Sequence, residues 1–261
     1  MLLQEPDQSP YDLRFEVLGF PVRVSWSFWV ASAVFGYGFA TSLDIQFGPN
    51  SPGILTLLLI WAACLFVSIL IHELGHSLAF RQNGIDSSIV LYFMGGMAIP
   101  RSTFSASRGF DGMSEKQSMW VAAAGPLAQI LSALVLIVLI RVAGYSPPVP
   151  WPLTSIPWLL QGGTIDSVGL LSIVAMYVYP SVLWALLNLV PVLPLDGGRI
   201  MHAFLQMQGG NIVQAMWVSV ITAGLLAAYG FSNDQHYLGF LFLILGVNNF
   251  QAIQQINGPR Y

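Results

Sequence analysis

Two histidines and a glutamate stand at a spacing that suits a metal ion. His72 and His76 are four residues apart, and Glu73 directly follows the first of them. Residues four apart share one face of a helix, so both imidazoles can bind a single zinc ion at about 2.0–2.1 Å. Zinc lowers the pKa of a bound water to about 7, and Glu73 is placed to accept the remaining proton as general base. The pattern therefore predicts a hydrolytic zinc site.

Asp196 is the expected third ligand of this site. A catalytic zinc ion commonly has three protein ligands and one open position. Asp196 follows Pro191 and Pro194, which remove backbone donors and oppose continuation of a helix. The chain is therefore expected to break before Asp196. Gly197 and Gly198 are expected to let it turn sharply and pass close to the ion.

Four other polar or reactive residues stand outside this ligand set. Asn188 stands eight residues before Asp196, and its amide either donates to a substrate carbonyl or oxyanion, or caps carbonyls that the prolines free. His202 is expected beside the ligands or at the interface rather than on the metal, since three ligands already fill the protein shell. His236 falls in an expected outer turn, away from the site. Cys64 is expected as a small core residue.

The elements that position these residues are membrane spans. The chain has 261 residues, of which 55% are hydrophobic and 8% charged, whereas soluble domains carry roughly 25% charged residues. About 20 apolar residues cross a bilayer as a helix. Six segments meet or approach that length: 24–43, 54–82, 118–141, 168–190, 212–231 and 237–254. At this depth an irregular backbone must be buried or line a wet cavity, so the break before Asp196 predicts a polar site.

The distribution of cations predicts the orientation of the spans. If the six spans alternate from an inner start, Arg141 lies alone on one side and the other eight Lys and Arg residues lie on the opposite side. Loops rich in Lys and Arg are cytoplasmic, so both termini are expected in the cytoplasm. The second and fourth spans then carry His72, His76 and Asp196 at their inner ends. The site is expected toward the cytoplasmic side.

Short strands are expected near this site. Residues 1–23 hold a cytoplasmic hairpin signal, in which Leu13–Val17 and Phe20–Val24 alternate around a turn. Segment 83–117 contains strand-like residues bent at Gly95–Gly96, followed by a polar loop over 101–115. This loop and the outermost spans are the candidates for a gate. Segment 142–167 is expected as an outer loop. The fold class is an all-α polytopic membrane protein of about six helices, with short strands, forming one domain over 1–261.

These motifs resemble those of the site-2 protease family of intramembrane zinc metalloproteases. The resemblance rests on HELGH at 72–76 and NLVPVLPLDG at 188–197, supported by FMGG at 93–96 and AGPLA at 124–128. It implies zinc ligation by His72, His76 and Asp196, acid and base catalysis by Glu73, and assistance by Asn188. It also implies a core of the second, third and fourth spans, a bacterial inner-membrane location, and a compact member without a PDZ-like or nucleotide-sensing domain.

The expected activity is hydrolysis of peptide bonds within or near membrane segments. Single-span proteins are the expected substrates, with anti-sigma factors or membrane-tethered regulators implied by the resemblance. An unwound substrate is expected to pair with the strand-like edge at Ile89–Ile99. A zinc transporter or sensor is the alternative, although the fifth and sixth spans lack the acidic or histidine path it would need. A catalytically silent scaffold, which would hold membrane proteins without cutting them, is disfavoured by the intact Glu73. The net charge of −3 argues against nucleic acid as a binding partner.

Overall fold

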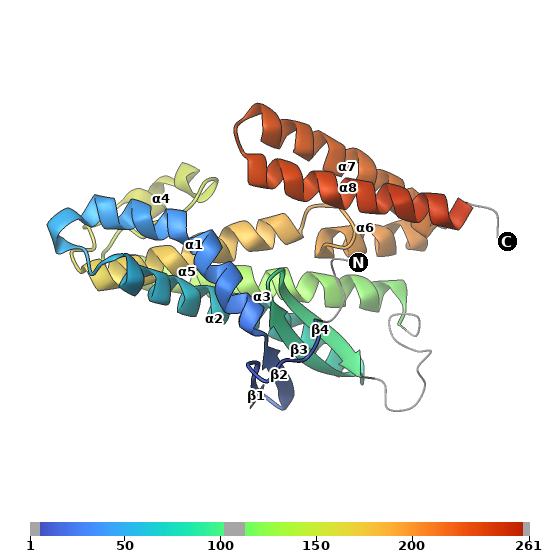
Figure 1. Cartoon of the computed structure of the whole chain (residues 1–261), viewed down its shortest axis with the longest axis horizontal. Helices are drawn as coiled ribbons and strands as arrows, with labels where there is room; N and C mark the ends of the chain where they lie inside the picture. The colour runs from blue at the N-terminus through green and yellow to red at the C-terminus, as the bar shows by residue number, and fades with distance from the viewer. Residues whose placement is uncertain (1–5, 102–112, 258–261) are drawn as a thin grey trace. The chain divides into compact units, whose positions relative to one another are not determined.

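The computed structural model describes residues 6–101 and 113–257, and the chain within it is mainly helical (Figure 1). It divides into two compact units, one formed by residues 1–102 and 127–185 and the other by 103–126 and 186–261. The polar loop expected as a candidate gate falls largely on 102–112, outside the described residues. Whether these units act as the single domain expected from the sequence stays a prediction.

Among the described residues, six long apolar helices correspond to the expected membrane spans, and each is long enough to cross a bilayer. Their bounds are α1 Trp26–Phe47, α2 Ile54–Gln82, α3 Glu115–Val142, α5 Val168–Asn188, α7 Ile212–Ser232 and α8 His236–Asn257. The expected ends agree to within a few residues, and for α2 they coincide. Apolar side chains cover these helices on all sides because lipid replaces water as the outer solvent. The prediction of an integral membrane protein is confirmed.

A four-stranded sheet accompanies the helices of the first unit. Its order is β1-β2-β3-β4, with β1 Leu13–Val17, β2 Phe20–Val24, β3 Asp86–Tyr92 and β4 Gly95–Arg101. The pairs β1–β2 and β3–β4 are antiparallel, and β2 pairs with β3 in parallel. The N-terminal hairpin is thus confirmed with its expected bounds. β4 forms one edge of the sheet.

The turn between β3 and β4 differs from the expected one. Phe93 and Met94 make the turn, and Gly95 and Gly96 already belong to β4. Gly95 has φ 114°, and a Cβ atom on it would stand 2.5 Å from the indole of Trp184 in α5. These glycines are therefore explained by close approach of other side chains, and the prediction of a bend at them is wrong.

Three helices of the first unit are joined through their polar residues. Ser68 of α2 lies 2.8 Å from both the Gln129 amide of α3 and the Ser181 hydroxyl of α5. All three side chains are fully buried. These are the helices expected to form the catalytic core, and their contact is made by hydrogen bonds inside an otherwise apolar interior.

The segment expected as an outer loop contains two short helices, η3 Leu153–Ser155 and α4 Pro157–Leu160. Another 3-10 turn, η1 Gly48–Asn50, follows α1. The second unit contains α6 Asp196–Met207 besides the hairpin of α7 and α8.

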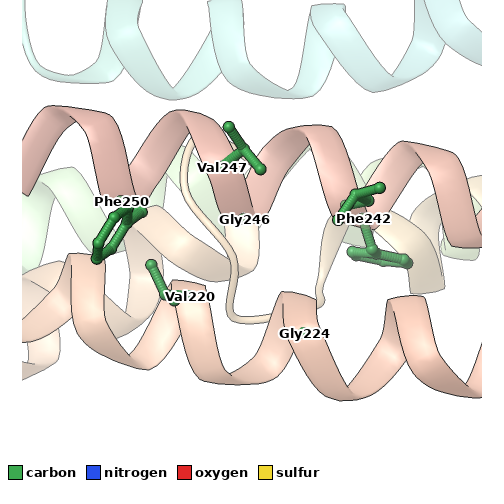
Figure 2. A pocket seen from close by; sticks show the side chains of 7 residues that line it. Val220, Gly224, Phe242, Gly246, Val247 and Phe250 are labelled. Carbon is green, nitrogen blue, oxygen red and sulfur yellow. The ribbon is translucent and has the colours of Figure 1, made fainter.

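The α7–α8 hairpin is built for close packing at its turn. A Cβ atom on Gly230 would stand 2.6 Å from the backbone nitrogen of Gly239, so a larger residue cannot occupy this crossing. Farther along, a hollow of about 370 Å³ lies between the two helices (Figure 2). Its lining is apolar and consists of Val220, Gly224, Phe242, Leu243, Gly246, Val247 and Phe250. It offers no group for the chemistry expected at the histidines.

Candidate metal centre

The histidine pair lies on the buried face near the C-terminal end of α2. His72 is 2% exposed and His76 is 6% exposed, and their Nε2 atoms stand 3.1 Å apart. Two nitrogens at about 2.0–2.1 Å from a tetrahedral zinc ion lie about 3.3 Å apart. The observed separation therefore fits two imidazoles that share one ion. A helix turn places them so because residues four apart project to the same side.

The ring of His72 is oriented by a hydrogen bond at its second nitrogen, Nδ1. The Nδ1 atom of His72 lies 2.9 Å from Oε1 of Gln129, which is itself fully buried. Histidines that bind zinc generally carry such a partner on the second ring nitrogen, and it sets the tautomer and the ring plane. The donor set and its surroundings therefore suit zinc.

Glu73 of α2 is buried beside the first residues of β4. Its side chain is 4% exposed. A Cβ atom on Gly96 would stand 2.5 Å from both Cγ and Oε1 of Glu73, so only glycine fits here without displacing the carboxylate. An edge strand thus brings its backbone directly against the expected general base. The sequence indicated both residues but not their contact.

Tyr92 is a polar residue of this region that the sequence reasoning missed. It ends β3, and its buried hydroxyl has no hydrogen-bond partner among the residues that the structure describes. Burial, and in addition the negative charge of Glu73, raise the pKa of Tyr92 to about 12. The phenol therefore stays neutral and offers a hydrogen-bond donor within electrostatic reach of Glu73.

The raised pKa of Tyr92 predicts a loss of stability at high pH. The folded state holds this proton up to about pH 12, whereas an unfolded chain releases it near pH 10. The contribution of the neutral phenol is complete below pH 10 and is lost as pH rises from about 10 to about 12. Unfolding midpoints of the wild type should therefore fall more steeply across this window than those of Tyr92→Phe. Equal slopes would contradict the assignment.

Asp196 begins α6 in the second unit, directly after the proline-containing break. α5 ends at Asn188, and the residues between Asn188 and Asp196 are not helical. The expected break is therefore present. Asp196 is 6% exposed, and its position in the first turn of a helix favours a negative charge. Asn188 is the last residue of α5 and is half-buried.

Gly197 and Gly198 serve a different purpose from the expected sharp turn. Both are helical and belong to the first turn of α6. Cβ atoms on them would stand 2.1 Å from the carbonyl oxygen of Leu189 and 2.4 Å from the backbone nitrogen of Leu193. They are glycines because the preceding loop folds back onto the helix start. The prediction that they make the turn is wrong.

The backbone of the break is held by the hairpin that follows it. The N–H group of Leu193 donates to Oγ of Ser219 in α7 at 2.9 Å, and its carbonyl accepts from Nδ2 of Asn249 in α8 at 2.6 Å. Ser219 and Asn249 are both buried. An irregular backbone in an apolar interior needs such partners. These two residues therefore support the loop that leads to Asp196.

We predict that Asn249→Leu destabilises the protein. The substitution leaves the buried carbonyl of Leu193 without its donor, a loss that typically costs about 1–3 kcal/mol. Asn248→Leu is the matched control, because Asn248 is the exposed neighbour in the same helix. Thermal unfolding in detergent should give a lower midpoint for Asn249→Leu and a nearly unchanged one for Asn248→Leu. Equal midpoints in the two variants would refute the support assigned to Asn249.

The three remaining candidates from the sequence differ in their surroundings. Cys64 is buried in an apolar cluster, as expected. His202 lies on α6, where its Nε2 is buried without a hydrogen-bond partner among the described residues, and burial lowers its pKa. His236 is exposed at the start of α8.

Comparison with known proteins gives a consistent set of relatives. The sequence model of peptidase family M50 matches residues 60–229. The chain is 32% identical over 193 residues to the provisionally named zinc metalloprotease sll0528 of Synechocystis, covering 74% of this chain and 43% of that protein. Rip3 of Mycobacterium tuberculosis, also provisionally named a zinc metalloprotease, is 30% identical over 207 residues, with 76% and 44% covered. The chain therefore spans about half the length of the curated relatives it matches.

A solved structure shares the fold. The site-2 protease from Methanocaldococcus jannaschii superposes with a TM-score of 0.50 at 22% identity, covering 93% of this chain and 95% of that one. At this identity the likeness concerns the fold. The expected fold class is confirmed.

Proposed function

Because this chain belongs to peptidase family M50, we propose that it is a zinc metalloprotease that cuts other proteins within or near their membrane-spanning segments. One observation carries the proposal: the Nε2 atoms of the buried pair His72 and His76 lie 3.1 Å apart on α2, the helix that also holds the buried Glu73. The names of the relatives support zinc as the metal. An acidic residue at membrane depth also calls for a function, since burying it is costly.

His72, His76 and Asp196 are the proposed zinc ligands. All three side chains are buried. Two neutral imidazoles and one carboxylate leave a fourth position for water or substrate, as in catalytic zinc sites. A zinc ion held by these residues would supply Lewis acidity toward a water molecule and a carbonyl oxygen.

Glu73 is the proposed acid and base of the reaction. Its carboxylate takes a proton from the attacking water and returns it to the leaving amine. The backbone of Gly96 confines the carboxylate from one side, so its position is restricted before substrate binds. Asn188 is proposed to donate its amide hydrogens to the carbonyl oxygen on which negative charge develops.

The edge of β4 is the proposed docking line for the substrate. A helical substrate has its carbonyls bonded within its own helix, so its scissile bond becomes accessible only when the segment unwinds. An unwound segment regains its hydrogen bonds by adding a strand to an exposed sheet edge. β4 begins at Gly95, and its second residue contacts Glu73. This edge therefore presents an extended segment near the general base.

The proposed setting is the inner membrane of a bacterial cell, with both termini and the site toward the cytoplasm. The cation distribution of the loops supports this orientation. Single-span membrane proteins are the proposed substrates, including anti-sigma factors and membrane-tethered regulators, and the lipid bilayer surrounds enzyme and substrate.

Metal removal tests the proposed activity. The full chain is purified in detergent and incubated with single-span substrates before chelation, after chelation, and after return of zinc. Cleavage should disappear with the chelator and return with zinc, and mass spectrometry should place the cut within or beside the apolar segment. Cleavage that persists in chelated, zinc-depleted protein would refute zinc dependence. Cuts confined to distant soluble regions would refute the proposed substrate class.

A further inference from the structure

A continuous chain of hydrogen bonds leads from His72 into the interior of the first unit. The Nδ1 atom of His72 lies 2.9 Å from Oε1 of Gln129, and Nε2 of Gln129 donates to Oγ of Ser68 at 2.8 Å. Ser68 lies 2.8 Å from Oγ of Ser181, which donates to the carbonyl of Tyr177 at 2.6 Å. The side chains of Gln129, Ser68 and Ser181 are fully buried. Gln129, Ser68 and Ser181 carry no charge.

Counting hydrogens gives this chain of bonds a single direction. The backbone carbonyl of Tyr177 can only accept, so the hydroxyl of Ser181 donates its one hydrogen to it. The oxygen of Ser181 must therefore accept the hydrogen of Ser68. Because the hydroxyl of Ser68 donates its hydrogen to Ser181, its oxygen must accept a hydrogen from the amide of Gln129. The NH₂ group of Gln129 therefore faces Ser68, and its carbonyl oxygen faces His72. The ring of His72 must then carry its hydrogen on Nδ1.

We propose that Gln129, held by Ser68 and Ser181, is a positioning residue that sets the tautomer of His72. With its hydrogen on Nδ1, the imidazole presents the lone pair of Nε2 toward His76 and toward the metal. This inference rests on the proposed zinc site. The partner of a metal-binding histidine is commonly a carboxylate or a backbone carbonyl. Here a neutral amide accepts the hydrogen bond from the ring, so no further charge is buried.

A second chain of hydrogen bonds holds the backbone at Gln129. The hydroxyl of Tyr177 donates to Oγ of Ser132 at 2.7 Å, and Ser132 donates to the carbonyl of Gln129 at 2.7 Å. Tyr177 thus anchors Gln129 twice, once through the side-chain amide and once through the main chain. This double attachment between α3 and α5 keeps the amide at a set distance from α2.

Three substitutions test the proposal in the full chain in detergent. Gln129→Met keeps the length of the side chain and removes both hydrogen-bonding groups. Ser181→Ala frees the hydrogen of Ser68, so the amide of Gln129 can turn over and present its NH₂ group to His72. Ser172→Ala is the matched control, because Ser172 is an equally buried serine of α5 that bonds only a backbone carbonyl of its own helix among the described residues.

Two measurements apply to each variant. The first is the zinc dissociation constant from competition with a chelator. The second is the ¹⁵N spectrum of the histidine rings in zinc-free protein. The chain has four histidines, and the signal that disappears in His72→Ala belongs to His72. The spectrum reports which ring nitrogen carries hydrogen, so a general loss of packing does not imitate the expected change.

We expect a single Nδ1–H form of His72 in the wild type and in Ser172→Ala. Gln129→Met should give a mixture of tautomers and weaken zinc binding by about 10–100-fold, and Ser181→Ala should give a mixture with a smaller loss of affinity. Wild-type spectra and affinity in Gln129→Met would overturn the proposal, as would an Nε2–H form in the wild type. If Gln129→Met does not fold, the spectrum of Ser181→Ala decides. Absence of zinc binding in the wild type would instead refute the proposed function and leave the tautomer result standing.

Discussion

Replacing Glu73 with Gln is expected to abolish peptide hydrolysis while the protein retains its zinc. Glutamine has the size of glutamate but cannot accept the proton of the attacking water. General acid and base catalysis contributes about 10²–10⁴-fold to a rate, so cleavage should fall by at least that factor. The histidine nitrogens remain in place on the same face of α2, so zinc content should be unchanged.

The measurement pairs cleavage rate with zinc content in the same preparation. Glu115→Gln is the matched control, because Glu115 is an exposed glutamate at the start of α3. It should cleave at the wild-type rate. Wild-type cleavage by Glu73→Gln would eliminate the proposed role of Glu73.

Gly96→Ala is expected to reduce turnover by about 10²-fold or more with little effect on folding. The added methyl group would stand 2.5 Å from Cγ and Oε1 of Glu73, closer than real atoms pack. The glutamate side chain must therefore move. A misplacement of about 1 Å in a catalytic group can cost about 10²-fold in rate. The strand itself tolerates alanine because φ of Gly96 lies outside the left-handed region.

Gly38→Ala provides the control for adding a methyl group elsewhere. Gly38 lies in α1, and a Cβ atom on it would meet nothing within 4 Å. The rate at saturating substrate, zinc content and circular dichroism are compared for both variants. Turnover should fall in Gly96→Ala alone, with zinc and helicity retained in both. Unchanged turnover in Gly96→Ala would show that the contact with Glu73 does not constrain catalysis.

Strong local patterns made much of this fold predictable. Six spans follow from composition because lipid selects uncharged helices of a set length, and the break after Asn188 follows from Pro191 and Pro194. The hairpin at the N-terminus was recognisable because alternating residues flank a turn with positive φ at Leu18 and Gly19. Helical spacing alone places His72 and His76 on one face. Each of these features is local in sequence.

Features that depend on distant packing were not predictable. Gln129 is one glutamine within an apolar span, and its role emerges only when Ser68 and Ser181 from other helices meet it. Asn249 is an amide within an apolar span, and it is buried because it supports the backbone of Leu193. The glycines of β4 suggested a turn, whereas Glu73 and Trp184 require them for space. Tertiary contacts decide all of these.

The zinc content of ligand variants tests the central claim most directly. Wild type, His76→Ala, Asp196→Ala and the control His236→Ala are purified in parallel, and zinc per chain is measured by elemental analysis. The wild type and His236→Ala should hold about one zinc ion per chain, and the two ligand variants should lose most of it. Full zinc content in His76→Ala or Asp196→Ala would contradict a zinc site that takes ligands from both α2 and α6.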